Sequence, residues 1–96
     1  AYAARHLLPA VDHLLVMLYD LHWSGSDAGP VVARDWARDA LARWVTAAGP
    51  DRVVAALPVY GYRWRTGAPT DVVGWSDVQA LATRAGTRAV RDTASG

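Results

Sequence analysis

Tyr19 and Asp20 are the residues with the clearest potential for chemistry, because they end the nearly continuous apolar part of residues 11–23. An apolar run of this length predicts a strand over residues 11–19 that is buried on both faces, as in a parallel sheet covered by helices. Both side chains would then lie at the carboxyl end of the strand. Barrels and open sheets of the α/β class place their binding and catalytic groups at that end.

Each of these residues also has a purely structural interpretation. A buried Tyr19 would need only a partner for its hydroxyl, and Asp20 would need only to bond its own backbone in a loop. Met17 fits an ordinary core position equally well. The residue types alone therefore leave packing and chemistry open.

Other common kinds of active site find little support in the sequence. Asp20 and His22 form a D-x-H pair that can bind a metal in other folds, but no further cluster of His, Asp or Glu stands at ligand spacing. The chain has no G-x-S-x-G motif, no glycine loop for phosphate and no Cys nucleophile. We therefore expect neither a metal site nor a cofactor.

Composition and charge narrow the class of protein. The 96 residues make one small domain at most, and a hydrophobic fraction of 52% with five Trp indicates surfaces that something outside these residues covers. The net charge is +1 and the ten Arg are spread along the chain, which gives no argument for nucleic acid or an acidic membrane as a partner. No apolar stretch approaches the ~18 residues of a membrane helix. The chain starts at Ala1, and we expect it to be part of a longer protein.

A helix is predicted over residues 33–48, after a turn-forming loop at residues 24–30. Gly49 follows its last apolar residue and is expected to end it. The apolar residues at the spacing of one helical face are Trp36, Ala40, Leu41, Trp44, Val45 and Ala48.

Further elements complete an alternation of helices and strands. Residues 2–8 have helical character and are ended by Pro9. Residues 52–60 predict a second buried strand, with Pro58 at its last residues or at a bulge. Strands that alternate with helices imply parallel pairing and an α/β fold.

The last third of the sequence predicts a long loop and one more helix. Residues 61–74 are interpreted as a loop, which is long for a connection between a strand and a helix. Ser76 and Gln79 have the spacing of a capping box that opens a helix, and Gly86 is expected to stop it. A short strand is predicted at residues 87–91.

Several motifs occur together in the chain: M-L-Y-D at residues 17–20, H-W-S-G-S-D-A-G-P-V at residues 22–31, Trp36, and P-V-Y-G-Y-R-W at residues 58–64. In this order and spacing they resemble glycoside hydrolase family 18. The resemblance is closest to the branch of bacterial spore-cortex peptidoglycan hydrolases and chitinase-like proteins. It covers about residues 1–90.

Members of that family are (β/α)8 TIM barrels, so the resemblance implies that residues 1–96 are a partial catalytic domain. They would supply about two βα units, the sixth and seventh strands with their loops. A full barrel takes about 250 residues, so the resemblance implies the remainder of the barrel as a partner. We expect the isolated chain to be inactive, and poorly soluble because its strands would have unpaired edges. The resemblance also implies an extracellular or cell-envelope location.

The implied reaction is hydrolysis of β-1,4 bonds in polymers that contain N-acetylglucosamine, either peptidoglycan or chitin, with retention of configuration. In this family the acetamide oxygen of the substrate attacks the anomeric carbon, and a protonated Glu in a D-x-x-D-x-D-x-E motif donates to the leaving oxygen. The chain contains no Glu. The general acid must therefore lie outside these residues, or the parent protein is inactive.

The resemblance assigns catalytic roles to Tyr19 and Asp20. Tyr19 corresponds to the tyrosine whose hydroxyl donates to the acetamide carbonyl, where it helps most as charge develops in the cyclic intermediate. Asp20 corresponds to the carboxylate that bonds sugar hydroxyl or acetamide groups.

Substrate contacts are implied for Met17 under the acetamide methyl, for Tyr60 in the same pocket, for Tyr62, and for Trp64 as a stacking face. Many chitinases of the family have Arg at the position of Tyr62. This departure favours the peptidoglycan branch over chitin.

Two alternatives remain open at this point. The first is a catalytically inactive barrel that only binds carbohydrate, like a chitinase-like lectin. The second is an unrelated α/β domain whose aromatic residues form an interaction surface.

Overall fold

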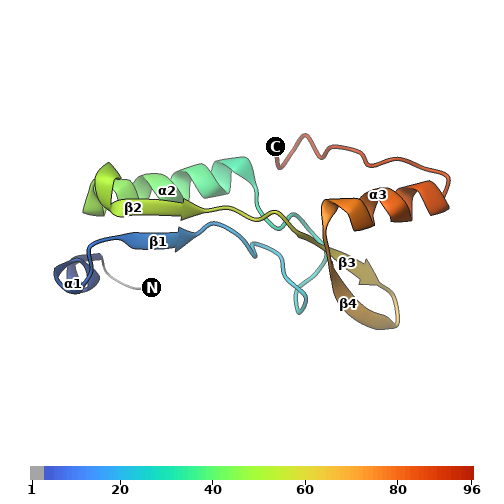
Figure 1. Ribbon diagram of the computed structural model, residues 1–96, viewed down its shortest axis with the longest axis horizontal. Helices are drawn as coiled ribbons and strands as arrows, with labels where there is room; N and C mark the ends of the chain where they lie inside the picture. The colour runs from blue at the N-terminus through green and yellow to red at the C-terminus, as the bar shows by residue number, and fades with distance from the viewer. Residues whose placement is uncertain (1–3) are drawn as a thin grey trace.

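The computed structural model describes residues 4–96, which form an elongated molecule of 52 × 25 × 21 Å (Figure 1). A parallel strand pair with the first two α-helices lies at one end of the long axis, and an antiparallel hairpin with the third α-helix lies at the other end. In chain order the elements are α1 (Ala4–Leu7), β1 (Leu14–Met17), α2 (Arg34–Ala48), β2 (Val53–Ala56), β3 (Gly61–Arg65), β4 (Ala68–Val73) and α3 (Trp75–Arg84).

The start of the described chain is helical, as predicted, but the helical segment does not end at Pro9. The helix expected over residues 2–8 is observed as α1, and Tyr2 lies outside the described residues. A 3-10 helix, Leu8–Ala10, follows directly and contains Pro9. Proline is tolerated in the first turn because its missing N–H would be unsatisfied there anyway, so Pro9 continues the helical path instead of ending it.

The predicted parallel pairing is confirmed for β1 and β2, with Leu14 opposite Val53. Both strands are shorter than the predicted ranges of residues 11–19 and 52–60. Pro58 falls beyond the end of β2, where its missing donor costs no ladder hydrogen bond.

One face of the strand pair is covered and the other is exposed. Leu14 and Val16 are half-buried, whereas Leu15 and Met17 are 64% and 62% exposed. The prediction of a strand buried on both faces is therefore wrong for this structure. The reason is that α2 packs beside β2, as Figure 1 shows, while none of residues 4–96 covers the opposite face.

Helix α2 confirms the predicted helix almost to the residue. Gly49 has φ +88°, and its N–H donates to the carbonyl of Val45 at 2.8 Å, which ends the helix as glycine commonly does. All six residues of the predicted apolar face are half-buried: Trp36, Ala40, Leu41, Trp44, Val45 and Ala48.

The segment interpreted as a long loop, residues 61–74, is instead an antiparallel hairpin of β3 and β4. Gly61 lies opposite Val73, and Gly67 takes φ +71° in the turn that joins the two strands. The loop prediction was wrong because Gly, Pro and Thr around this turn hid two short strands on either side of it.

Helix α3 is confirmed, but its predicted cap is wrong. The N-cap is Gly74, and its backbone N–H donates to the carboxylate of Asp77 at 2.8 Å. Ser76 lies inside the first turn and does not cap the helix. Gly86 has φ +66° and stops the helix, as predicted.

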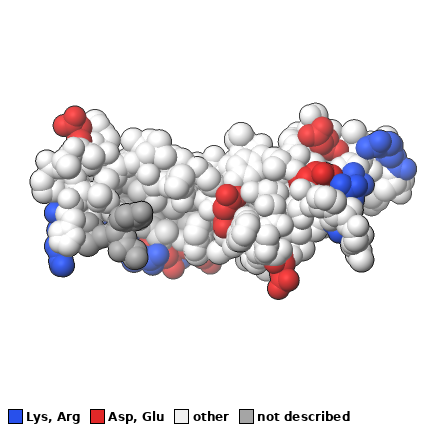
Figure 2. Space-filling model, turned by 90° about the horizontal axis from the view of Figure 1, so that it is seen from below, with Lys and Arg blue, Asp and Glu red and all other residues white. Residues whose placement is uncertain are grey.

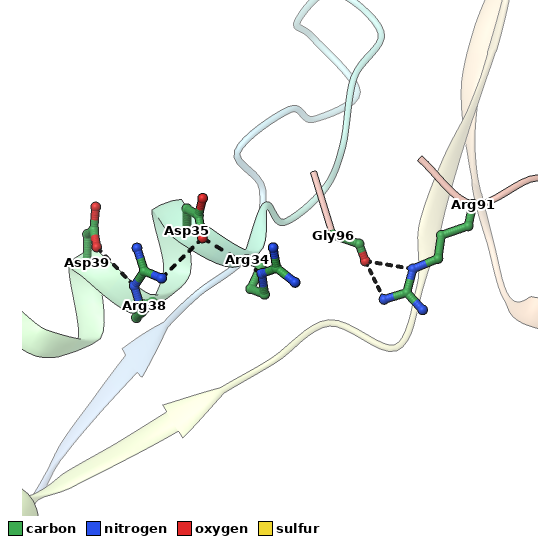
Figure 3. A network of polar contacts seen from close by, with 6 residues as sticks. All are labelled: Arg34, Asp35, Arg38, Asp39, Arg91 and Gly96. Atoms are coloured by element: carbon green, nitrogen blue, oxygen red, sulfur yellow. Dashed lines mark hydrogen bonds and ion pairs between the residues drawn. The ribbon is translucent and has the colours of Figure 1, made fainter. Parts of the chain in front are cut away.

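The chain after α3 returns toward α2 without forming the strand predicted at residues 87–91. The carbonyl of Ser95 accepts a hydrogen bond from the N–H of Arg34 at 2.8 Å, so this segment satisfies a free donor at the start of α2. Figure 3 shows Arg91 bonded to the carbonyl of Gly96 nearby. The returning segment is therefore held by a backbone bond to the start of α2 and by a side-chain bond within the segment itself.

Exposed ion pairs also follow the first turns of α2. Asp35 lies within ion-pair distance of Arg34 and of Arg38, at 3.7 and 3.3 Å, and Arg38 also reaches Asp39 at 3.4 Å (Figure 3). Pairs as exposed as these contribute little to stability.

The core is small. Leu18 is 2% exposed, and Ala37 and Val73 are also buried. Charged side chains of both signs are scattered over the face seen in Figure 2. No helix within residues 4–96 has both the length and the apolar character of a membrane span.

Candidate functional site

The candidate site begins where β1 ends. Leu18 continues the parallel ladder, since its N–H donates to the carbonyl of Ala56 at 2.9 Å, and its buried side chain anchors the strand end. Tyr19 follows and is half-buried. Asp20 has φ +58°, which makes it the only non-glycine residue with positive φ in residues 4–96. Asp tolerates this left-handed conformation better than most residues, and such positions occur often at functional sites.

Asp20 accepts two hydrogen bonds from tyrosines that are distant in the sequence. The hydroxyl of Tyr60 donates to Oδ1 at 2.6 Å, and the hydroxyl of Tyr62 donates to the same oxygen at 2.9 Å. Tyr60 lies after β2, and Tyr62 is the second residue of β3. Three predicted site residues from both strand ends are thus joined by two charge-assisted hydrogen bonds.

A row of aromatic rings extends from this carboxylate. The rings of Tyr19 and Tyr60 lie 6.2 Å apart, those of Tyr60 and Tyr62 lie 5.7 Å apart, and both pairs meet edge to face. Trp64 continues the row at 5.5 Å from Tyr62. These four residues, Tyr19, Tyr60, Tyr62 and Trp64, are called the aromatic row below.

Alternation along the extended chain explains why the second half of this row forms. Tyr60, Tyr62 and Trp64 are spaced by two residues, which places successive side chains on the same side of an extended segment. Edge-to-face pairs add about 0.5–1.5 kcal/mol beyond the burial of apolar area, so the contact between Tyr19 and Tyr60 helps to hold the segments after β1 and β2 together.

The two hydroxyls that bond Asp20 are held in their neutral form. The pKa of Tyr60 is raised well above its usual value, chiefly by the hydrogen bond to Asp20. The pKa of Tyr62 is also raised, first by loss of hydration and then by its bond to the same carboxylate. Ionisation of either phenol would place two negative charges side by side, so both remain donors at neutral pH.

Trp64 lies at an irregularity of the hairpin. The register of β3 and β4 shifts between Arg63 and Arg65, which leaves Trp64 at a bulge. Its indole Nε1–H is buried and has no hydrogen-bond partner within residues 4–96. A buried donor without a partner costs about 1–3 kcal/mol, so this position favours contact with an acceptor from elsewhere.

Met17 takes no part in these contacts. It lies on the exposed face of β1, and alternation places it on the same side of the strand as Tyr19. The structure therefore brings five of the six predicted site residues into one contiguous group, and it places Met17 next to that group.

The loop after Asp20 is closed by its own hydrogen bonds. Leu21 donates to the carbonyl of Val31 at 2.9 Å, and the N–H of His22 donates to Pro30 at 3.2 Å. The Nδ1 of His22 lies 3.0 Å from the same carbonyl, so this nitrogen carries the proton. His22 thus stabilises the loop. Within residues 4–96, no three His, Asp or Glu side chains are grouped so that they could hold a metal ion.

Arg52 is a positioning residue that the sequence interpretation missed. Its guanidinium donates to the carbonyls of Leu8 at 2.8 Å and Asp12 at 3.1 Å, and it also reaches that of Val11. These bonds tie the start of β2 to the segment that leads into β1. The only signal in the sequence was an Arg directly before an apolar strand, which is too common to be informative.

Comparison with curated proteins finds glycosylases. The chain is 28% identical over 72 residues to the uncharacterized glycosylase YvbX of Bacillus subtilis, which is 73% of this chain and 21% of that protein. It is 30% identical over 54 residues to the putative sporulation-specific glycosylase YdhD of the same organism, 56% of this chain and 13% of that protein. The chain thus spans about a fifth or less of these relatives. No protein-family model matches.

Solved structures of the same kind share the fold. A chitinase from Chromobacterium violaceum superposes with a TM-score of 0.86 at 33% identity, over 98% of this chain and 30% of that one. The spore cortex-lytic enzyme SleL of Bacillus cereus gives a TM-score of 0.84 at 18% identity, over 96% of this chain and 23% of that one, which is a likeness of fold alone. The chain is therefore an α/β segment that is similar in sequence and structure to chitinases and glycosylases.

Proposed function

We propose that this chain supplies the acetamide- and sugar-binding side of a glycosidase that hydrolyses polymers containing N-acetylglucosamine. The observation that carries the proposal is the Asp20 carboxylate, held by Tyr60 and Tyr62 at the carboxyl end of a parallel strand pair. Similarity to a chitinase over nearly the whole chain supports the reaction class.

The site residues have separate roles in this proposal. Tyr19 donates to the acetamide carbonyl of the substrate as that oxygen attacks the anomeric carbon, and Asp20 accepts a hydrogen bond from the sugar or the acetamide N–H. Trp64 and Tyr60 line the pocket. The chain contains no Glu, so the proton donor to the leaving oxygen comes from another part of the protein.

A (β/α)8 barrel of the family 18 type is the proposed setting for these roles. The exposed apolar face at Leu15 and Met17 fits the interior of such a barrel, where side chains of neighbouring strands would cover it. β1 and β2 would be its sixth and seventh strands, and the rest of the barrel would pair with their free edges. We further propose a location outside the cell or in its envelope, where the polymer lies.

Peptidoglycan is the proposed substrate rather than chitin. Tyr62 stands where many family chitinases have Arg, and it uses its hydroxyl to bond Asp20.

The test is hydrolysis of purified peptidoglycan and of chitin by the full-length protein that carries this chain, read as new reducing ends. Tyr19→Phe should lower turnover about a hundredfold or more, because one donor to a developing charge is lost. The control is Val59→Ala, which removes an exposed side chain outside the proposed contacts. Binding of these polymers without any hydrolysis would instead identify a carbohydrate-binding barrel, and absence of both would contradict the proposal.

A further inference from the structure

Tyr62 is placed so that its hydroxyl faces a protein group. The hydroxyl donates to Oδ1 of Asp20 at 2.9 Å. Its ring lies between two others, with the ring of Tyr60 at 5.7 Å and that of Trp64 at 5.5 Å. Both the polar tip and the flanks of this residue are therefore already engaged within the chain.

We propose that Tyr62 is a positioning residue that acts on the substrate through Asp20, and that Tyr60 shares this role. The proposal rests on the proposed function of the site. It departs from a direct contact between Tyr62 and the sugar, because the hydroxyl that would make such a contact is bonded to the carboxylate.

Asp20 has reason to need such support. Its backbone lies in the left-handed region at a strand end, and its side chain is exposed. A single carboxylate there would rotate freely and lose conformational entropy whenever it bound a ligand. Two donors on Oδ1 restrict that rotation, while Oδ2 receives no hydrogen bond from residues 4–96. The second oxygen is thus presented to an N–H or O–H of the substrate.

The identity of the donors also preserves the charge of Asp20. Both tyrosines are neutral, and within residues 4–96 no Arg or His forms an ion pair with this carboxylate. An Arg at position 62 would instead form an ion pair with the carboxylate, and its positive charge would offset the negative charge of Asp20. A tyrosine orients Asp20 and leaves its negative charge available.

A double-mutant cycle on the full-length protein separates this role from direct contact with substrate. Tyr62→Phe should lower kcat/KM for the cleaved polymer about tenfold, with the loss mainly in kcat. In an Asp20→Ala background the same substitution should change kcat/KM by less than about twofold, since the group through which Tyr62 acts is gone. Equal losses in the two backgrounds would overturn the proposal.

Phenol titration gives a readout that does not need activity. In a Tyr60→Phe background, which removes the coupled phenol, the absorbance difference made by adding Tyr62→Phe to the full-length protein isolates the ionisation of Tyr62. That ionisation should begin at a lower pH in an Asp20→Asn background, because the negative neighbour is removed. Trp64→Phe serves as the control, since it replaces the indole beside Tyr62 with a smaller ring and removes no hydroxyl donor to Asp20.

The two experiments distinguish the two ways of being wrong. An unchanged Tyr62 titration in Asp20→Asn overturns the positioning role, whether or not the protein hydrolyses a polymer. A shifted titration in a protein that neither cleaves nor binds N-acetylglucosamine polymers keeps the contact and refutes the proposed function together with any role toward that substrate.

Discussion

The hydroxyl of Tyr60 lies 2.6 Å from Oδ1 of Asp20, although 40 residues separate them in the chain. This bond connects the segments that follow β1 and β2. It can form only when the two strands are paired in the observed register, so it reports on the fold and on the site together.

Alkaline stability should depend on Tyr60. Its pKa is raised in the folded protein, so the stability that its bond to Asp20 contributes is complete below the usual tyrosine pKa of about 10. Above that pH the unfolded chain loses the phenol proton while the folded protein keeps it, and stability falls. Tyr60→Phe should therefore weaken the protein near neutral pH and flatten its loss of stability above pH ~10, as measured by denaturant unfolding across that range. Parallel curves for the two proteins would contradict the assignment.

Arg52→Ala, which removes the guanidinium, should destabilise the protein by about 2 kcal/mol because the backbone carbonyls of Leu8 and Asp12 lose charge-assisted bonds. Arg52→Lys should recover part of this loss, since one ammonium cannot reach several carbonyls at once. The measurement is the free energy of unfolding. Arg43→Ala is the control, because Arg43 is exposed on α2 and makes no ion pair among the described residues.

Gly29→Ala should disturb the loop after Asp20. A Cβ at this position would lie 2.5 Å from the imidazole of His22, so the ring would have to move and give up its bond to Pro30. We expect a cost of about 1–3 kcal/mol in unfolding free energy. Gly61→Ala is a suitable comparison, since its added methyl would meet Val73 at an ordinary 3.9 Å. A cost that persists when His22 is also replaced by Ala would show that the imidazole is not its cause.

The start of α3 allows a test of which side chains cap the helix: Asp77, as observed, or Ser76 and Gln79, as the sequence predicts. Asp77→Ala should cost about 1 kcal/mol of stability, because the N–H of Gly74 loses its acceptor and the helix loses an acidic group from its first turn. Ser76→Ala and Gln79→Ala, which remove the capping box expected from the sequence, should each change stability by less than about 0.5 kcal/mol. The measurement is thermal unfolding of the three variants, which distinguishes a cap formed by Asp77 from one formed by Ser76 and Gln79.

Local patterns in the sequence predicted what depends on local physics. The helical spacing between Trp36 and Ala48 fixed α2 and the face that it buries. The apolar run before Tyr19 and Asp20 placed both residues at a strand end, as observed. These predictions needed no information about partners distant in the chain.

The errors arose where neighbouring signals compete or where the partner is distant. Residues 66–69 include types that are common in turns, and we interpreted the whole segment around them as a loop. A hairpin needs only such a turn between two short strands. At α3, S-x-x-Q and G-x-x-D overlap, and the carboxylate of Asp77 formed the bond. The bonds from Tyr60 and Tyr62 to Asp20 depend on strand register, which no short motif specifies.

The bonds of Arg52 lie at the end of the strand pair opposite to Asp20. A strand advances about 3.3 Å per residue, so a slip of one residue at that end would carry Asp20 past the reach of a hydrogen bond from Tyr60. The bonds of Arg52 therefore help to fix the position of the Asp20 carboxylate from the end of the strand pair that is farthest from it. Substitutions far from the candidate site can therefore misalign it as effectively as substitutions within it.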